Sequence, residues 1–218
     1  IIVPGGKINA VGTASSPIVF TSALAPGLRS AGDWGGLVIV GKAPVNQTTA
    51  VVEGLSREVA YGTSVLASDK RDAADNSGTL KYVRIEFAGI SLQPDKEING
   101  LTLCAVGSGT TIDHIQVSYC GDDSFEWFGG NVNCKYLIAY KGWDDDFDTD
   151  NGFSGNVQFG LAIRDSKIAD TSQSNGFESD NCADGSAVSP YTTATFSNIT
   201  FVGPKLDNNF VNTPDYIT

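Results

Sequence analysis

Short runs in which apolar and polar residues alternate recur along the chain, and most of them end at Gly, Asn or Asp. Such runs are typical of β-strands closed by tight turns, whereas helix-like periodicity is nearly absent. We therefore predict an all-β chain, with strands in the segments 17–21, 36–40, 82–89, 114–121, 136–142, 159–163 and 196–203.

A second pattern, Phe followed by an acidic residue, repeats at Phe125, Phe147 and Phe177. The intervals are about 22 and about 30 residues, so the second one contains an inserted loop of about eight residues. A period near 22 with short strands in each repeat predicts a parallel β-solenoid. We expect a right-handed single-stranded parallel β-helix that forms a single domain over residues 1–218.

The alternating runs follow the same period. Ile115 matches Tyr136 about 21 residues later, and Tyr136 matches Phe159 about 23 residues later. An antiparallel sandwich is the alternative, because its strands also recur every 8–12 residues. That architecture accounts for the strands but not for the matched Phe–acid repeats.

Stacked coils bring equivalent residues to about 4.8 Å from one another. Alternation then points four aromatic residues inward as a stack, namely Phe125, Trp127, Phe147 and Phe177. The acids that follow each Phe point outward in two columns, the first of Glu126, Asp148 and Glu178 and the second of Asp150 and Asp180.

Charge narrows the range of partners. The formal net charge is −11, which argues against a nucleic-acid backbone and against an anionic membrane surface. The sequence has no apolar run of 18 residues, so it predicts no membrane span.

Four cysteines allow three complete disulfide pairings, and the sequence does not choose among them. Cys104 lies in an apolar run and is expected to be a buried thiol. Cys120, Cys134 and Cys182 lie among polar residues, where one disulfide would form in a secreted protein.

Several segments resemble bacterial secreted right-handed parallel β-helix proteins: 12–22 (GTASSPIVFTS), 32–37 (GDWGGL), 75–89 (DNSGTLKYVRIEFAG), 121–130 (GDDSFEWFGG) and 142–153 (GWDDDFDTDNGF). The resemblance covers about residues 8–204. It implies the same fold and a secreted or cell-surface location, often in lipoprotein-type domains without an assigned activity. It also implies coils beyond Thr218, so that the chain is part of a longer helix.

The acidic residues are concentrated, because 13 of the 25 fall between Asp122 and Asp184. Carboxylates about 5 Å apart repel by on the order of 3 kcal/mol at an effective dielectric constant near 20. A hard cation relieves this repulsion, and Ca²⁺ is the leading candidate. The expected metal ligands are Asp146, Asp148, Asp150, Glu178 and Asp180. Solvated acids that cap turns or block edge pairing are the competing interpretation.

A ligand site is expected on the same face. Trp143 precedes three aspartates and is expected to be exposed, and Asp122, Asp123 and Glu126 complete the candidate set. Exposed rings beside carboxylates can stack on sugars.

The preferred function is a structural or adhesive rod that presents this acidic face to a polysaccharide or another cell-surface partner. The alternative is a polysaccharide-active enzyme, a lyase or a glycoside hydrolase, that uses the same carboxylates. Asp122–Asp123 and 148–152 look somewhat like polygalacturonase motifs, but their order is reversed and no His-Gly or Arg-Ile-Lys element follows. We assign no catalytic residue.

The ends of the chain suggest a third role. The sequence has no Met and begins at Ile1, which indicates a mature form or a fragment. Uncapped ends of a solenoid expose unpaired strand edges, which permits end-to-end self-assembly.

Overall fold

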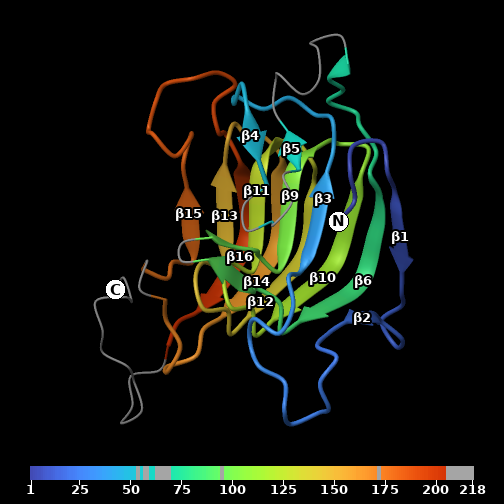
Figure 1. Cartoon of the computed structure of the whole chain (residues 1–218), viewed down its shortest axis with the longest axis vertical. Coiled ribbons are helices and arrows are strands. Elements are labelled where there is room, and N and C mark those ends of the chain that lie inside the picture. The colour runs from blue at the N-terminus through green and yellow to red at the C-terminus, as the bar shows by residue number, and fades with distance from the viewer. Residues whose placement is uncertain (53–54, 56–58, 62–69, 94–95, 171–172, 205–218) are drawn as a thin grey trace.

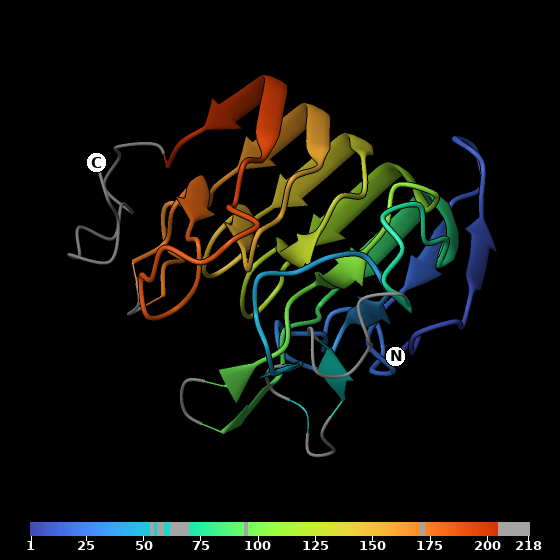
Figure 2. The same ribbon diagram turned by 90° about the horizontal axis from the view of Figure 1, so that it is seen from above.

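A computed structural model describes residues 1–218 except 53–54, 56–58, 62–69, 94–95, 171–172 and 205–218. The described chain forms two stacked parallel sheets (Figures 1 and 2). The seven-stranded sheet contains β1 (Ile8–Val11), β2 (Ile18–Phe20), β6 (Gly78–Glu86), β10 (Thr111–Ser118), β12 (Cys134–Tyr140), β14 (Asn156–Ile163) and β16 (Thr195–Val202). The five-stranded sheet contains β3 (Leu37–Val40), β9 (Leu101–Val106), β11 (Phe125–Gly130), β13 (Phe147–Asp150) and β15 (Phe177–Ser179).

The chain alternates between these sheets, and each new coil stacks on the one before it, as Figure 2 shows from β1 at one end to β16 at the other. All pairings within the two sheets are parallel. The prediction of a parallel β-helix is confirmed, and the antiparallel sandwich is excluded.

The Phe–acid repeat has the predicted register. Phe125 pairs with Phe147, and Phe147 pairs with Phe177. The rings of the first pair are stacked with centroids 5.7 Å apart, and those of the second are 5.8 Å apart. Phe125, Trp127 and Phe147 are fully buried, whereas Phe177 is 42% exposed because β15 is the last strand of its sheet in the described part of the chain.

The predicted match of Tyr136 with Phe159 is confirmed, but the match of Ile115 with Tyr136 was wrong by one residue. Ile115 pairs with Leu137, not with Tyr136. A shift of one residue moves a side chain to the other face of a strand, so Leu137 is buried while Tyr136 is 43% exposed.

The long strands β6, β10, β12, β14 and β16 each contain a left-handed residue. Tyr82, His114, Tyr136, Phe159 and Asn198 have φ between 50° and 63°, at the same place in five successive coils. Each puts two consecutive side chains on the outer face, as a β-bulge does. This conformation costs a residue other than Gly about 1–2 kcal/mol, so the contacts made there have to offset that cost.

A second core covers part of the outer face of the five-stranded sheet. Val38, Cys104 and Phe128 pack there against Val52 and Tyr61 from the hairpin of β4 (Ala50–Val51) and β5 (Ala60–Tyr61). A second hairpin, β7 (Ser91–Gln93) and β8 (Lys96–Glu97), lies on the same side (Figure 2). Sheets covered on both faces have continuous apolar strands, which explains the run Leu101–Val106.

All four cysteines are buried and free. The expectation that Cys104 is a buried thiol is confirmed. The polar surroundings inferred for Cys120 and Cys134 were wrong, because both thiols point inward into the hydrophobic core. Those inferred for Cys182 are confirmed, because its thiol contacts Asp184 and Ser186.

Candidate functional site

The acids that follow the repeated Phe residues form the expected column, which we call the acidic column: Glu126 pairs with Asp148, and Asp148 pairs with Glu178. The structure brings carboxylate oxygens together in two groups. In each group the oxygens lie within 4.8 Å of one another. The groups are Asp123, Glu126 and Asp148, and Asp122, Asp123 and Asp144.

One end of the acidic column is covered. Asp123 and Glu126 are each only 8% exposed, and Glu126 accepts a hydrogen bond from the Asn99 side-chain amide. Asp123 Oδ1 accepts a hydrogen bond of 2.9 Å from the Asp145 backbone. At the other end Glu178 is exposed on the edge strand β15. The outward column is therefore open only toward its C-terminal end.

Burial and neighbouring negative charges both raise the pKa values of these carboxyls. Burial, followed by the charge of Asp148, raises the pKa of Glu126 well above its usual range. Burial also raises the pKa of Asp148 to about 7, although a hydrogen bond with Glu126 lowers it in part. Burial and the neighbouring Glu178 carboxyl raise the pKa of Asp145 to about 9. Near neutral pH the column therefore holds protons that isolated acids would have lost.

The expected metal ligands separate into different surroundings. Asp148 lies with Asp123 and Glu126, whose oxygens are the donors that a hard cation takes. Asp146 is fully buried and pairs instead with Arg164 at 3.3 Å. Asp150 accepts a hydrogen bond of 2.5 Å from the Asn151 backbone.

Burial and then the charges of Asp180 and Glu178 raise the pKa of Asp150 to about 6. Asp180 follows β15 and is exposed. The calcium site stays a prediction for which Asp123, Glu126 and Asp148 have the closest geometry.

Trp143 is 42% exposed, as expected. Its backbone carbonyl accepts hydrogen bonds from Arg164 at 3.2 Å and from Ser174 at 2.6 Å. These contacts fix the loop before Asp144, and sugar binding by the Trp143 ring stays a prediction.

The left-handed residues of the seven-stranded sheet form an outer stack, which we call the aromatic ladder: Tyr82, His114, Tyr136 and Phe159. Successive ring centroids lie 4.3, 4.3 and 4.9 Å apart. The ring contacts and the burial of ring area help to offset the cost of the left-handed backbone.

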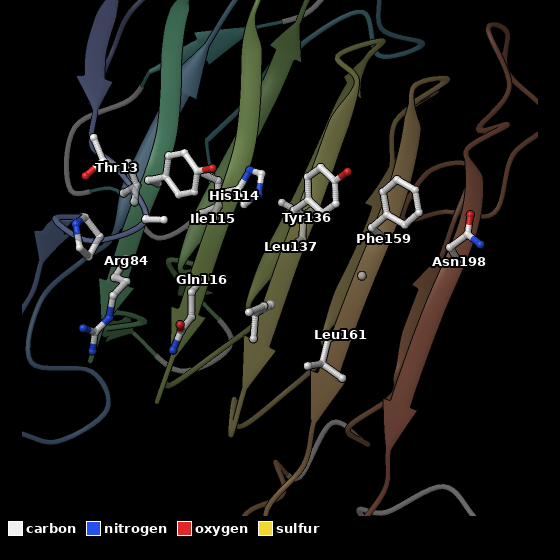
Figure 3. A pocket seen from close by; sticks show the side chains of 16 residues that line it. Thr13, Arg84, His114, Ile115, Gln116, Tyr136, Leu137, Phe159, Leu161 and Asn198 are labelled. Carbon is white, nitrogen blue, oxygen red and sulfur yellow. The ribbon is translucent and has the colours of Figure 1, made fainter.

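The aromatic ladder borders a hollow of about 550 Å³, which we call the trough (Figure 3). A parallel column of outward side chains on the same strands lines it as well: Arg84, Gln116, Ile138 and Leu161. Thr13, Ala14 and Pro17 line it from the β1–β2 connection, and Asn198 lines it from β16.

Charged groups near the trough are paired. Asp113 binds Lys81 at 2.9 Å and also contacts the His114 ring. Burial would raise the pKa of Asp113, but the hydrogen bonds from Lys81 and His114 outweigh it, and the pKa lies below its ordinary value. Arg84 pairs with Glu86. The trough thus combines apolar surface with hydroxyl, amide and imidazole groups and paired charges.

Sequence reasoning did not find the trough, because it treated Tyr136 as one position of an ordinary alternating strand. A signal was nevertheless present. Three successive coils have a ring immediately before a residue that faces inward, namely Tyr82–Val83, His114–Ile115 and Tyr136–Leu137.

A family model for a pectate-lyase-like β-helix domain matches residues 1–211. The chain belongs to this family. The family membership agrees with the β-helix that the repeats predicted. No curated protein and no solved structure matches the chain. Among the described residues of this pectate-lyase-like domain, no helix has the length and apolar character needed to cross a membrane.

Proposed function

We propose that this domain binds a neutral polysaccharide in the trough, outside the cell, and does not cleave it. The observation that carries the proposal is the aromatic ladder, which runs across four coils beside a hollow of about 550 Å³. That volume lies within the usual range of ligand sites, about 300–1,000 Å³, and such sites combine apolar walls with a few polar groups.

The ladder suits an elongated, hydroxyl-rich chain. Its rings stack on one another, so each one offers its edge and, in Tyr82 and Tyr136, a hydroxyl group to a ligand. Coils repeat at about 4.8 Å, which is comparable to the length of one sugar residue along an extended polysaccharide. A sugar chain lying along the helix axis would meet an equivalent set of ring edges at each residue.

The charges favour a neutral ligand over an acidic one. Lys81 and Arg84, beside the trough, already have the carboxylate partners Asp113 and Glu86. The whole chain carries a net charge of −11, which repels polyanions at long range.

The enzymatic alternative has support from Glu126 and Asp148. Their carboxyl oxygens lie within 4.8 Å of each other, and glycoside hydrolases use closely spaced carboxyl pairs in which one partner is protonated. Glu126 is buried, however, and the pair lies on the five-stranded sheet while the trough lies on the seven-stranded sheet. A chain bound in the trough would not reach these carboxyls, so we favour binding without cleavage.

A panel of xylan, mixed-linkage glucan, galactomannan and polygalacturonate tests the proposal by affinity electrophoresis, with reducing-end release measured in parallel. We expect at least one neutral polysaccharide to bind. Tyr136→Ala and Phe159→Ala should each weaken that binding by about tenfold, because each removes ring contacts along the ladder. Tyr191→Ala, which removes another exposed tyrosine that does not line the trough, should leave binding unchanged.

Failure of all four polysaccharides to bind would overturn the proposal, as would full binding by Tyr136→Ala. Tighter binding of polygalacturonate with the same dependence on Tyr136 would overturn the neutral class. Release of reducing ends that Glu126→Gln abolishes would establish the enzymatic alternative instead.

A further inference from the structure

The first coil differs from all later ones at the position of the aromatic ladder. Val11 pairs with Lys81, and Ile18 pairs with Val83. Between these partners β6 has a single residue, Tyr82, whereas the first coil has residues 12–17. The extra residues therefore leave the sheet where the next coil places one ring.

These residues form a closed turn. The Thr13 and Ser16 backbones exchange two hydrogen bonds, of 3.0 and 3.1 Å. Gly12 donates a hydrogen bond of 2.8 Å to the Lys81 carbonyl. A Cβ atom on Gly12 would lie only 2.6 Å from the Tyr82 carbonyl oxygen, so glycine lets the turn sit directly against the ladder.

The turn closes one end of the trough. Thr13, Ala14 and Pro17 line it beside β6, and Figure 3 shows Thr13 at the end of the row of ladder side chains. We call residues 12–17 the end wall. At the opposite end the ladder position continues to Asn198 on β16, which is the last strand of the sheet in the described chain. The end wall thus bounds the trough beside β6, and the described ladder position runs from there to Asn198.

Polar groups are also distributed unevenly along the trough. Near the end wall lie the Thr13 and Tyr82 hydroxyls, the Arg84 guanidinium and the Gln116 amide. The middle and the far part contribute the Tyr136 hydroxyl and the Asn198 amide, but they otherwise present the apolar side chains of Ile138 and Leu161 and the Phe159 ring. A terminal sugar has one free hydroxyl more than an internal residue, so a cluster of polar groups at a closed end suits a terminal residue.

We infer that the trough binds the end of a neutral polysaccharide chain rather than its interior, and that the end wall determines this specificity. The inference rests on the proposed function. The terminal sugar lies against the end wall among Thr13, Tyr82 and Arg84, and the rest of the chain extends along the ladder toward Asn198.

The test uses xylo-oligosaccharides and cello-oligosaccharides, from disaccharide to hexasaccharide, together with xylan fractions of known mean length. Calorimetry with the unaltered protein should give one bound domain per xylan chain whatever the length of that chain. A bulky aryl group attached to one end of the hexasaccharide should weaken binding at least tenfold, while the same group at the other end should change it little. A number of bound domains that rises with chain length, or indifference to both caps, would overturn the inference.

A variant in which one asparagine replaces residues 12–17 reproduces the arrangement at Asn198 and opens the trough. Its number of bound domains per chain should rise with xylan length, whereas Ser15→Ala, which keeps the end wall, should behave as the parent does. Length-independent binding by the folded deletion variant would contradict the role of the end wall. If no oligosaccharide and no polysaccharide binds, the proposed function itself fails. If binding depends on Tyr136 but the number of bound domains rises with chain length for the unaltered protein, the end-binding inference is overturned and the proposed function stands.

Discussion

The outer faces of the two sheets carry columns built by the same stacking rule but of opposite chemistry. On the five-stranded sheet Glu126, Asp148 and Glu178 stand in register, and on the seven-stranded sheet the rings of Tyr82, His114 and Tyr136 do so. A solenoid repeats every side chain at the same short spacing, so rings gain contacts while carboxylates gain repulsion. The acidic column has to hold protons or a cation, whereas the aromatic ladder is stable while partly exposed.

The two columns also differ in how far other parts of the chain cover them. Asn99 and the core around Tyr61 and Phe128 bury the acidic column at Glu126, which further raises the cost of ionisation. The trough beside the aromatic ladder stays open. The aromatic ladder lies beside an open trough and can contact a ligand. The covered part of the acidic column chiefly affects the stability of the fold.

The largest expected effect is on the pH dependence of stability. The folded-state pKa of Asp148 is raised to about 7, so folding favours its protonated form. The contribution of this group to stability should therefore be fully present below about pH 4 and should be lost as the pH rises from there through about 7. Asp148→Asn removes the ionisation and should raise the unfolding free energy at pH 8 by on the order of 2 kcal/mol, with a clearly smaller gain at pH 5. Urea unfolding at both values measures this difference.

Asp184→Asn provides a control of opposite sign. Hydrogen bonds from Ser186 and Cys182 lower the pKa of Asp184 to about 2, so this carboxylate favours folding when it is ionised. Its replacement should lower stability at both pH 5 and pH 8. Equal behaviour of the two variants would show that ionisation of a carboxyl in the acidic column is no more costly than ionisation of Asp184.

A smaller effect is expected from calcium. If Ca²⁺ binds at Asp123, Glu126 and Asp148, a concentration about tenfold above its Kd should stabilise the fold by about 1.4 kcal/mol. The gain should be larger at pH 8 than at pH 5, because protons compete for the same oxygens. Thermal unfolding in millimolar Ca²⁺ and in EDTA measures it, with Asp148→Asn as the variant that should lose the response. Identical melting curves would support the solvated-acid interpretation.

The smallest effect concerns the aromatic ladder. Tyr136→Asn removes the ring contacts with His114 and Phe159, but asparagine tolerates the left-handed backbone and already occupies this position at Asn198. We expect a loss of about 1 kcal/mol or less. Tyr136→Ala should lose more, since alanine lacks that tolerance. Equal unfolding free energies for the two variants would show that the backbone conformation carries no cost here.

The sequence was informative where one feature repeated without interruption. Phe125, Phe147 and Phe177 share the same following acid, and their predicted register is the observed one. It misled where apolar and aromatic residues also lie on the outer face. Ile115 faces inward and Tyr136 faces outward, so matching the two alternating runs placed Tyr136 where Leu137 belongs.

By itself, the sequence determined that the chain coils into a parallel β-helix and that its acids stack. The reason is that the spacing of the inward aromatic residues follows the number of residues in each coil. Only the tertiary structure decided which column is covered and where the trough ends. Those outcomes depend on contacts between segments far apart in the chain, such as Asn99 with Glu126, Tyr61 with Asn151, and the turn at Gly12 with Tyr82. No local pattern encodes such contacts, because the two residues of each contact come together only when coils and insertions fold back on one another.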